Sequence, residues 1–135
     1  MSVEYSDKDG RVITIDKLKQ GSDIRAQVVI KNTSARELLN LSLTQMVPSG
    51  WEILNTRDAA SGSEINESAF DYRDFRDDRV HTYFGLKAGE SRRYVVQFNA
   101  AYPGRYYLPG WNVEAMYDAK RHARVTGQWV NVEEQ

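Results

Sequence analysis

The chain has 135 residues and no cysteine, and its 18 basic and 19 acidic residues leave a net charge of −1. These numbers exclude a disulfide framework and thiolate metal sites, and they provide no basic excess for non-specific nucleic-acid binding. The length predicts a single domain, 1–135, and no apolar run reaches the ~18 residues of a membrane span or signal sequence.

Alternation of apolar and polar residues predicts β-strands along most of the chain. The first clear run is 23–31, with Ile24, Ala26, Val28 and Ile30 on one face. Leu39, Leu41 and Leu43 alternate in the same way, and further strand-like runs cover 80–86, 91–101, 105–108, 111–116 and 128–132. About eight strands separated by glycine, proline and asparagine turns predict an all-β fold, an antiparallel sandwich of two sheets.

Two segments leave the local structure open. Residues 34–37 match a capping box, which favours a helix, but the leucine alternation that follows favours a strand, which we prefer. The polar stretch 56–69 is a long connection, in which one short helix near 64–68 is the alternative to an irregular loop.

Charged residues are densest in the segment 72–79. We interpret them as a structural network of ion pairs, made by Arg73, Asp74, Arg76, Asp77, Asp78 and Arg79. A calcium site on the three aspartates is the alternative, although the arginines between them would compete for the carboxylates. Asp77 or Asp78 beside His81 also suggests part of a catalytic triad. No nucleophile motif accompanies these residues, so we predict neither an enzyme nor a bound metal or cofactor.

The segment 101–118 is the richest in aromatic residues. Alternation places Trp111, Val113, Ala115 and Tyr117 on one side of a strand and Met116 on the other. From the residues alone, Met116 is either buried in the sandwich or part of an apolar cap for a partner.

Four motifs carry a resemblance to a known family. They are PSGWEI at 48–53, RDDRV at 76–80, PGRYYLPG at 103–110 and EAMYD at 114–118. With the upstream stretch LKQGSDIRAQVVIKNTS, the chain resembles the last macroglobulin-like domain of bacterial alpha-2-macroglobulins over nearly its whole length. In position this domain corresponds to the receptor-binding domain of the eukaryotic inhibitors, a macroglobulin-like β-sandwich of the immunoglobulin-like kind.

The resemblance implies a non-catalytic C-terminal fragment of a large periplasmic protease inhibitor, often lipid-anchored to the inner membrane. Proteases that cleave its bait region trigger a rearrangement that exposes a thioester held in another domain. The resemblance assigns Met116 and Tyr117 to an interdomain contact that shields this thioester. The implied partners are the thioester domain, neighbouring macroglobulin-like domains and, through the full-length protein, target proteases, with no nucleic acid and no direct membrane insertion.

Another class of function remains open. A free-standing extracytoplasmic adhesion or carbohydrate-binding module would use exposed aromatic rings to stack on sugars, and Trp51, Trp111 and Trp129 are the candidates.

Overall fold

The computed structural model describes residues 1–54, 68–116 and 118–134, and for residues 118–121 only the backbone. Its regular structure is entirely β. The strands are β1 (Ser2–Ser6), β2 (Lys17–Lys19), β3 (Asp23–Lys31), β4 (Leu38–Met46), β5 (Glu52–Leu54), β6 (Tyr72–Phe75), β7 (Arg79–Leu86), β8 (Ser91–Asn99), β9 (Gly104–Leu108), β10 (Asn112–Ala115), β11 (Asp118–Arg124) and β12 (Gln128–Glu133).

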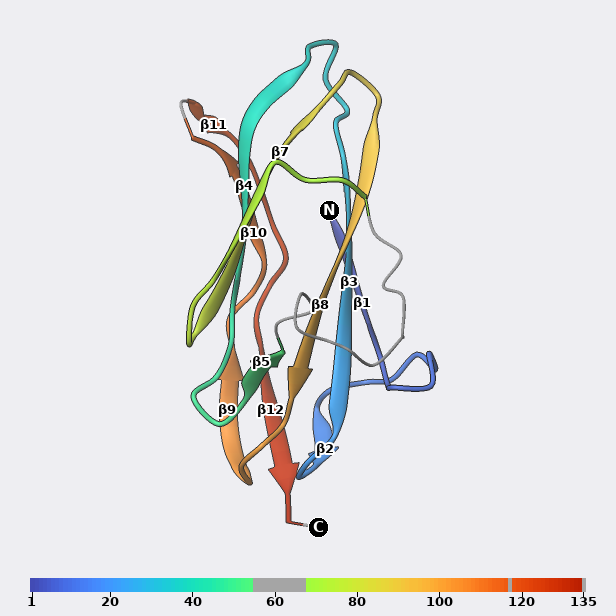
Figure 1. Ribbon diagram of the computed structural model, residues 1–135, viewed down its shortest axis with the longest axis vertical. Coiled ribbons are helices and arrows are strands. Elements are labelled where there is room, and N and C mark those ends of the chain that lie inside the picture. The colour runs from blue at the N-terminus through green and yellow to red at the C-terminus, as the bar shows by residue number, and fades with distance from the viewer. Residues whose placement is uncertain (55–67, 117, 135) are drawn as a thin grey trace.

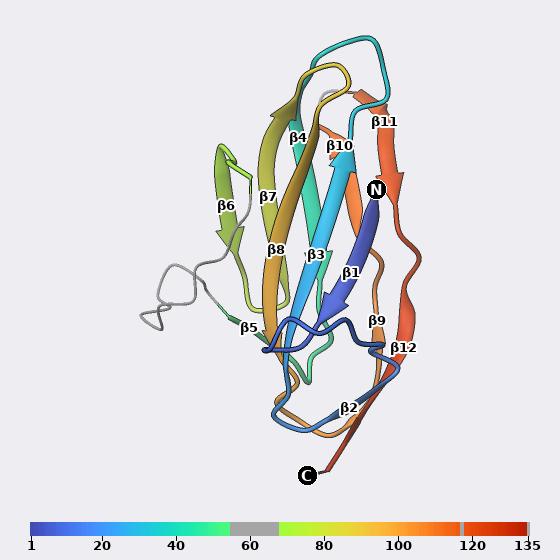
Figure 2. The same ribbon diagram turned by 90° about the vertical axis from the view of Figure 1, so that its right-hand side faces the viewer.

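The strands form three sheets that build an elongated sandwich. A four-stranded sheet has the order β1-β3-β8-β5, and a five-stranded sheet has the order β11-β10-β4-β7-β6. Figures 1 and 2 show these two sheets lying face to face along the long axis. The third sheet, β2-β12-β9, lies toward the lower end in Figure 1, where the chain also ends.

The long strands form because one face of each is apolar. In β3, Ile24, Ala26, Val28 and Ile30 are all buried, and the residues between them are not. β3 pairs with β8 in an unbroken antiparallel register from Asp23 opposite Asn99 to Lys31 opposite Ser91. The core between the sheets is mainly aliphatic and also contains aromatic rings, such as those of Phe84 and Tyr94, whose centres are 4.9 Å apart. Burial of the apolar faces therefore holds the two layers together.

The all-β sandwich is confirmed, and three details of the prediction are corrected. There are twelve strands within the described residues rather than about eight, and three sheets rather than two. β2 pairs with β12 in parallel, while the other strand pairs are antiparallel. The additional strands are short or highly charged strands, such as β2 and β11, in which alternation is too brief or too polar to detect.

The two open segments have different outcomes. Residues 34–36 form a bend, and β4 begins at Leu38, so the strand is confirmed over the helix. The Asn32 side chain organises this bend, since its amide donates to the Arg36 and Leu86 carbonyls and its oxygen accepts from Ser34. The helical turn expected near 64–68 falls almost entirely outside the described residues.

β4 departs from the expected alternation at one point. Leu41 and Leu43 are buried as predicted, but Leu39 is 63% exposed. The cause is a β-bulge: Leu38 pairs with Leu86 and Leu41 with Phe84, so Leu39 and Asn40 together lie opposite Gly85. Asn40 has a φ of +55°, in the left-handed region that asparagine tolerates better than most residues.

In the part of the chain that the structure describes, no helix has the length and apolar character needed to cross a membrane.

Candidate interaction surface

The charged segment 72–79 forms a hairpin of β6 and β7, and two ion pairs form within it among the described residues. Arg76 Nε donates to Asp74 Oδ2 at 2.9 Å. The Arg79 guanidinium donates to both oxygens of Asp78, at 3.1 and 3.0 Å. Among the described residues none forms an ion pair with Asp77. The predicted network is thus two separate pairs on the surface, and exposed pairs of this kind stabilise a protein only weakly.

The pKa values in this hairpin reflect those pairs and local burial. The hydrogen bond from Arg79 holds the pKa of the Asp78 carboxyl below its usual value, and Asp78 in turn raises the pKa of Arg79. Partial burial lowers the pKa of His81, and the nearby Arg79 charge lowers it further. The RDDRV motif therefore lies at a charge-paired turn between β6 and β7.

Arg73, which we assigned to the same network, lies on β6 of this hairpin but is turned toward the core. Its side chain is buried and 3% exposed, its Nε donates to Thr82 Oγ1 at 3.1 Å, and its guanidinium lies 4.2 Å from the centre of the Phe70 ring. The Tyr94 ring is 5.8 Å away, and the Tyr94 hydroxyl donates to the Ala69 carbonyl at 2.8 Å. Arg73 therefore packs against Phe70, because alternation in β6 turns it inward between exposed Tyr72 and Asp74.

Neither the calcium site nor the catalytic triad gains support from the described residues of this hairpin. Asp74 and Asp78 are each engaged by an arginine, and within the described residues no three acidic or histidine side chains are grouped closely enough to hold a metal ion. His81 Nδ1 lies 3.0 Å from Thr44 Oγ1, so its described hydrogen bond is to a threonine on β4 and not to Asp77 or Asp78.

The three tryptophans divide between core and surface. Trp51 is 3% exposed and Trp111 is 1% exposed, which corrects their assignment to a sugar-binding face. Trp129 is 55% exposed on β12, and Tyr107 of β9 lies against it with ring centres 5.5 Å apart. The Arg105 guanidinium lies 4.7 Å from the centre of the Trp129 ring. Only one of the three candidate rings is therefore available to stack on a ligand.

The β10–β11 hairpin places Met116 at its tip. Ala115 pairs with Asp118, which makes the connection between the strands very short. Trp111, Val113 and Ala115 are buried, as the alternation predicted, and Met116 is 55% exposed. Of the two alternatives that the sequence left open, burial of Met116 in the sandwich is therefore wrong. Tyr117, predicted with it, lies outside the described residues.

A backbone hydrogen bond joins the hairpin tip to the bulge in β4. The Met116 N–H donates to the Asn40 carbonyl at 3.0 Å, one step beyond the pairing of Ala115 with Leu41. Exposed Leu39 adjoins that carbonyl in sequence. Sequence reasoning missed this arrangement, although Asn40 within a leucine alternation is a residue type that allows a bulge.

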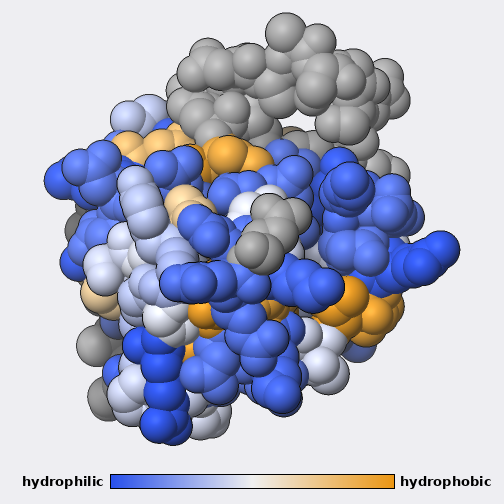
Figure 3. Space-filling view, turned by 90° about the horizontal axis from the view of Figure 1, so that it is seen from below, coloured by the Kyte–Doolittle hydropathy of each residue, from blue (hydrophilic) through white to orange (hydrophobic). Residues whose placement is uncertain are grey.

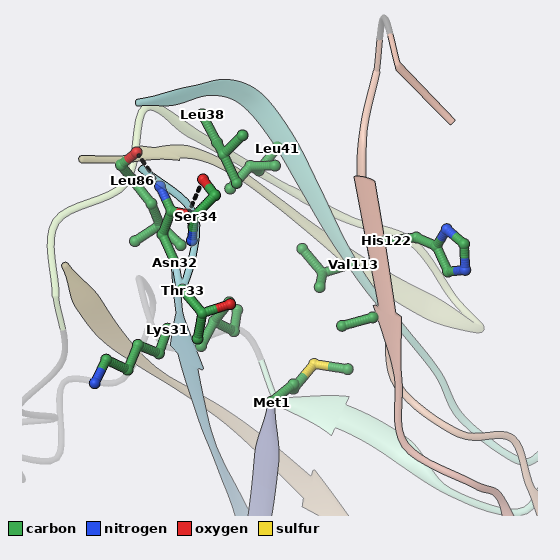
Figure 4. A pocket seen from close by; sticks show the side chains of 12 residues that line it. Met1, Lys31, Asn32, Thr33, Ser34, Leu38, Leu41, Leu86, Val113 and His122 are labelled. Carbon is green, nitrogen blue, oxygen red and sulfur yellow. Dashed lines mark hydrogen bonds between the residues drawn. The ribbon is translucent and has the colours of Figure 1, made fainter. Parts of the chain in front are cut away.

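A cavity of about 330 Å³ lies between the two large sheets, beside the bulge in β4. Figure 4 shows Asn32, Leu38, Leu41, Leu86 and Val113 around it, with Met1 below. Leu38 and Leu41 flank the bulge, so the bulge separates an inner, cavity-lining pair of leucines from outward-facing Leu39. The opposite, lower end has mostly hydrophilic side chains with separate hydrophobic patches (Figure 3).

The model of one protein family matches most of the chain. It is described as "Bacterial Alpha-2-macroglobulin MG10 domain" and matches residues 1–119. The alpha-2-macroglobulin of Rickettsia conorii is 26% identical over 125 residues, which cover 90% of this chain and 6% of that protein. The chain thus spans only a small fraction of the length of its curated relatives.

Solved structures agree in fold. Salmonella alpha-2-macroglobulin reacted with methylamine matches 98% of this chain and 9% of its own, with a TM-score of 0.82 at 23% identity. Escherichia coli alpha-2-macroglobulin activated by porcine elastase matches 98% of this chain and 13% of its own, with a TM-score of 0.83 at 22% identity. At these identities the likeness establishes the sandwich architecture.

Proposed function

The chain belongs to the bacterial alpha-2-macroglobulin MG10 domain family, and from this premise we propose that it is a non-catalytic interaction domain of a protease inhibitor. In this proposal the MG10 domain packs against the thioester domain of the same polypeptide. The contact shields the thioester until a protease cleaves the bait region, and the resulting rearrangement breaks the contact.

Shielding is a physical requirement of a stored thioester. A thioester is an acyl donor, and an amine that reaches it attacks the acyl carbon and forms an amide. The carbon–sulfur bond breaks, and the sulfur leaves as a thiolate that takes up a proton from the amine. Apolar side chains at a domain contact slow this reaction because they exclude water and amines. A domain with this role needs no reactive group of its own.

The observation that carries the proposal is the exposed side chain of Met116 at the tip of the β10–β11 hairpin. A methionine is flexible and polarizable, so it adapts to an apolar partner surface. The relatives from Salmonella reacted with methylamine and from Escherichia coli activated by elastase support thioester chemistry and protease triggering for this chain's parent. The EAMYD motif adds Tyr117 to the proposed contact.

The test uses the full-length parent protein before any protease is added. Met116→Ala and Tyr117→Ala are each expected to increase the rate of thiol release in methylamine by roughly tenfold or more, since a buried side chain of this size contributes a few kcal/mol. Val12→Ala is the matched control, because Val12 is also exposed, at 67%, and lies between β1 and β2. The loop that joins these two strands is in the lower half of Figure 1, whereas β11 is near the top.

Two outcomes would contradict the proposal. One is a parent that releases no thiol in methylamine, and the other is a pair of variants that release thiol at the rate of the unchanged protein. The periplasmic location and the lipid anchor belong to the same proposal, and they are supported by the family resemblance. Cell fractionation of the parent, with and without treatment that removes its lipid, tests both.

A further inference from the structure

Contacts with both neighbouring strands support the bulge in β4. Leu39 and Asn40 share one partner position, Gly85, on β7. A β-carbon at Gly85 would lie 3.2 Å from the Leu38 carbonyl oxygen and 3.6 Å from Leu39 Cδ2. The glycine therefore gives the extra residue room to sit against the neighbouring strand. On the other side of β4, the Asn40 carbonyl accepts the Met116 N–H at 3.0 Å.

The hydrogen bond matters because little else in the described backbone holds Met116. Ala115 pairs with Leu41 on one side and with Asp118 on the other, and β10 ends at Ala115. The register of β10 with β11 also shifts between Glu114 and Ala115. The Asn40 carbonyl is thus the contact that extends the β4–β10 ladder by one residue and fixes the direction in which the hairpin tip leaves the sheet.

We propose that Asn40 is a positioning residue for Met116, and that Leu39, turned outward by the same bulge, belongs to the surface that contacts the thioester domain. This inference rests on the function proposed above and names two further residues of its contact. Asn40 combines a left-handed φ of +55° with a carbonyl that accepts the Met116 N–H. A regular strand would bury Leu39 beside Leu41 and would leave the tip without this anchor.

The apolar character of the exposed side chains at the bulge indicates which partner covers them. Leu39 and Met116 are both apolar and are 63% and 55% exposed. Leu39 lies on β4, and Met116 directly follows β10, the strand beside it in the sheet. The family relatives are more than ten times longer than this chain, so most of the parent polypeptide lies outside the structure. An apolar surface patch of the neighbouring thioester domain is the occupant that fits both facts.

The experiment compares substitutions that keep and that disfavour the left-handed conformation, in the full-length parent. Asn40→Gly keeps the conformation and the carbonyl, and it is expected to leave thiol release in methylamine unchanged. Asn40→Val disfavours the conformation and is expected to raise the rate by about three- to tenfold. Leu39→Ser is expected to raise the rate to a similar extent, without a change in the melting temperature.

Two further measurements separate positioning from general destabilisation. If Asn40 acts through Met116, Asn40→Val adds nothing to the rate of Met116→Ala, whereas independent effects would multiply. The amide proton of Met116 is also expected to exchange faster in Asn40→Val and at an unchanged rate in Asn40→Gly, as measured by mass spectrometry of the hairpin peptide.

The outcomes distinguish this inference from the function on which it rests. If Met116→Ala does not change thiol release, the proposed function fails. If Met116→Ala accelerates it but both Leu39→Ser and Asn40→Val leave it unchanged, the function stands and the positioning role is wrong. Rates of Asn40→Val and Met116→Ala that multiply in the double variant also overturn the positioning role.

Discussion

The charged hairpin 72–79 and the bulge at Leu39 and Asn40 both lie in the five-stranded sheet. Side-chain interactions characterise the first, and backbone interactions characterise the second. In the hairpin, charged side chains pair with each other in solvent, as Asp78 does with Arg79. At the bulge, a backbone carbonyl and a left-handed φ hold apolar side chains in the solvent.

The difference teaches that density of charged residues is a poor guide to function in this domain. Six charged side chains in eight residues were the most conspicuous feature of the sequence. Within the described residues the structure separates them into two surface pairs, an aspartate without an ion pair (Asp77) and a buried arginine (Arg73). The apolar surface was less conspicuous because one of its determinants is a backbone conformation. Three substitutions in and near the hairpin sharpen this contrast.

Arg73→Ala is expected to have the largest effect. It removes a buried side chain that packs on Phe70 and donates to Thr82, so the free energy of unfolding should fall by about 2–4 kcal/mol. Chemical denaturation measures the change. Arg76→Ala is the control, because Arg76 is exposed and pairs only on the surface, and it should change little. Equal effects of the two substitutions would remove the distinction between buried and surface arginines.

His81 is expected to give a smaller, pH-dependent effect. Its pKa is lowered in the folded protein, chiefly by burial, so below about pH 6.5 the unfolded chain takes up the proton more readily than the folded one. The free energy of unfolding should therefore decrease as the pH falls from 7 to 5. His81→Gln, which keeps a hydrogen-bonding group near Thr44, should reduce that slope. A slope that the substitution does not alter would show that other groups cause it.

Asp78→Asn should have the smallest effect. The pair with Arg79 lowers the pKa of Asp78, so its stabilising contribution is present above the unfolded value near 4 and is lost as the pH falls through the lower folded value. Because the Asp78 side chain is exposed on the surface, the melting temperature at neutral pH should be almost unchanged. A large decrease would mean that the surface pair stabilises the hairpin, contrary to the contrast drawn here.

The sandwich was predictable because it depends on alternation. In β3, β8 and β10 the predicted faces are buried, and Met116 and Glu114 point outward. Strands such as β2, with one buried leucine between two lysines, escaped prediction because three residues carry too little pattern. Such a segment becomes a strand because it pairs with another part of the chain, as β2 does with β12.

The proposed contact surface could be predicted from the sequence only in part. Met116 came from a motif, EAMYD, that a family resemblance made interpretable. Leu39 could not be recognised, because a bulge changes the face of a residue without changing the hydrophobic pattern around it. The burial of Arg73 was also hidden, since a stretch of charges gives no sign of which one turns toward the aromatic core.

The separation of the tryptophans gives the domain a built-in optical probe. Trp51 and Trp111 lie in the core, whereas Trp129 is in contact with water and lies beside the positive charge of Arg105. A soluble quencher should therefore reach only one of the three emitting rings in the folded state. Trp129→Phe would leave a spectrum that comes from the interior alone, so that melting of the core and events at the lower sheet can be followed separately.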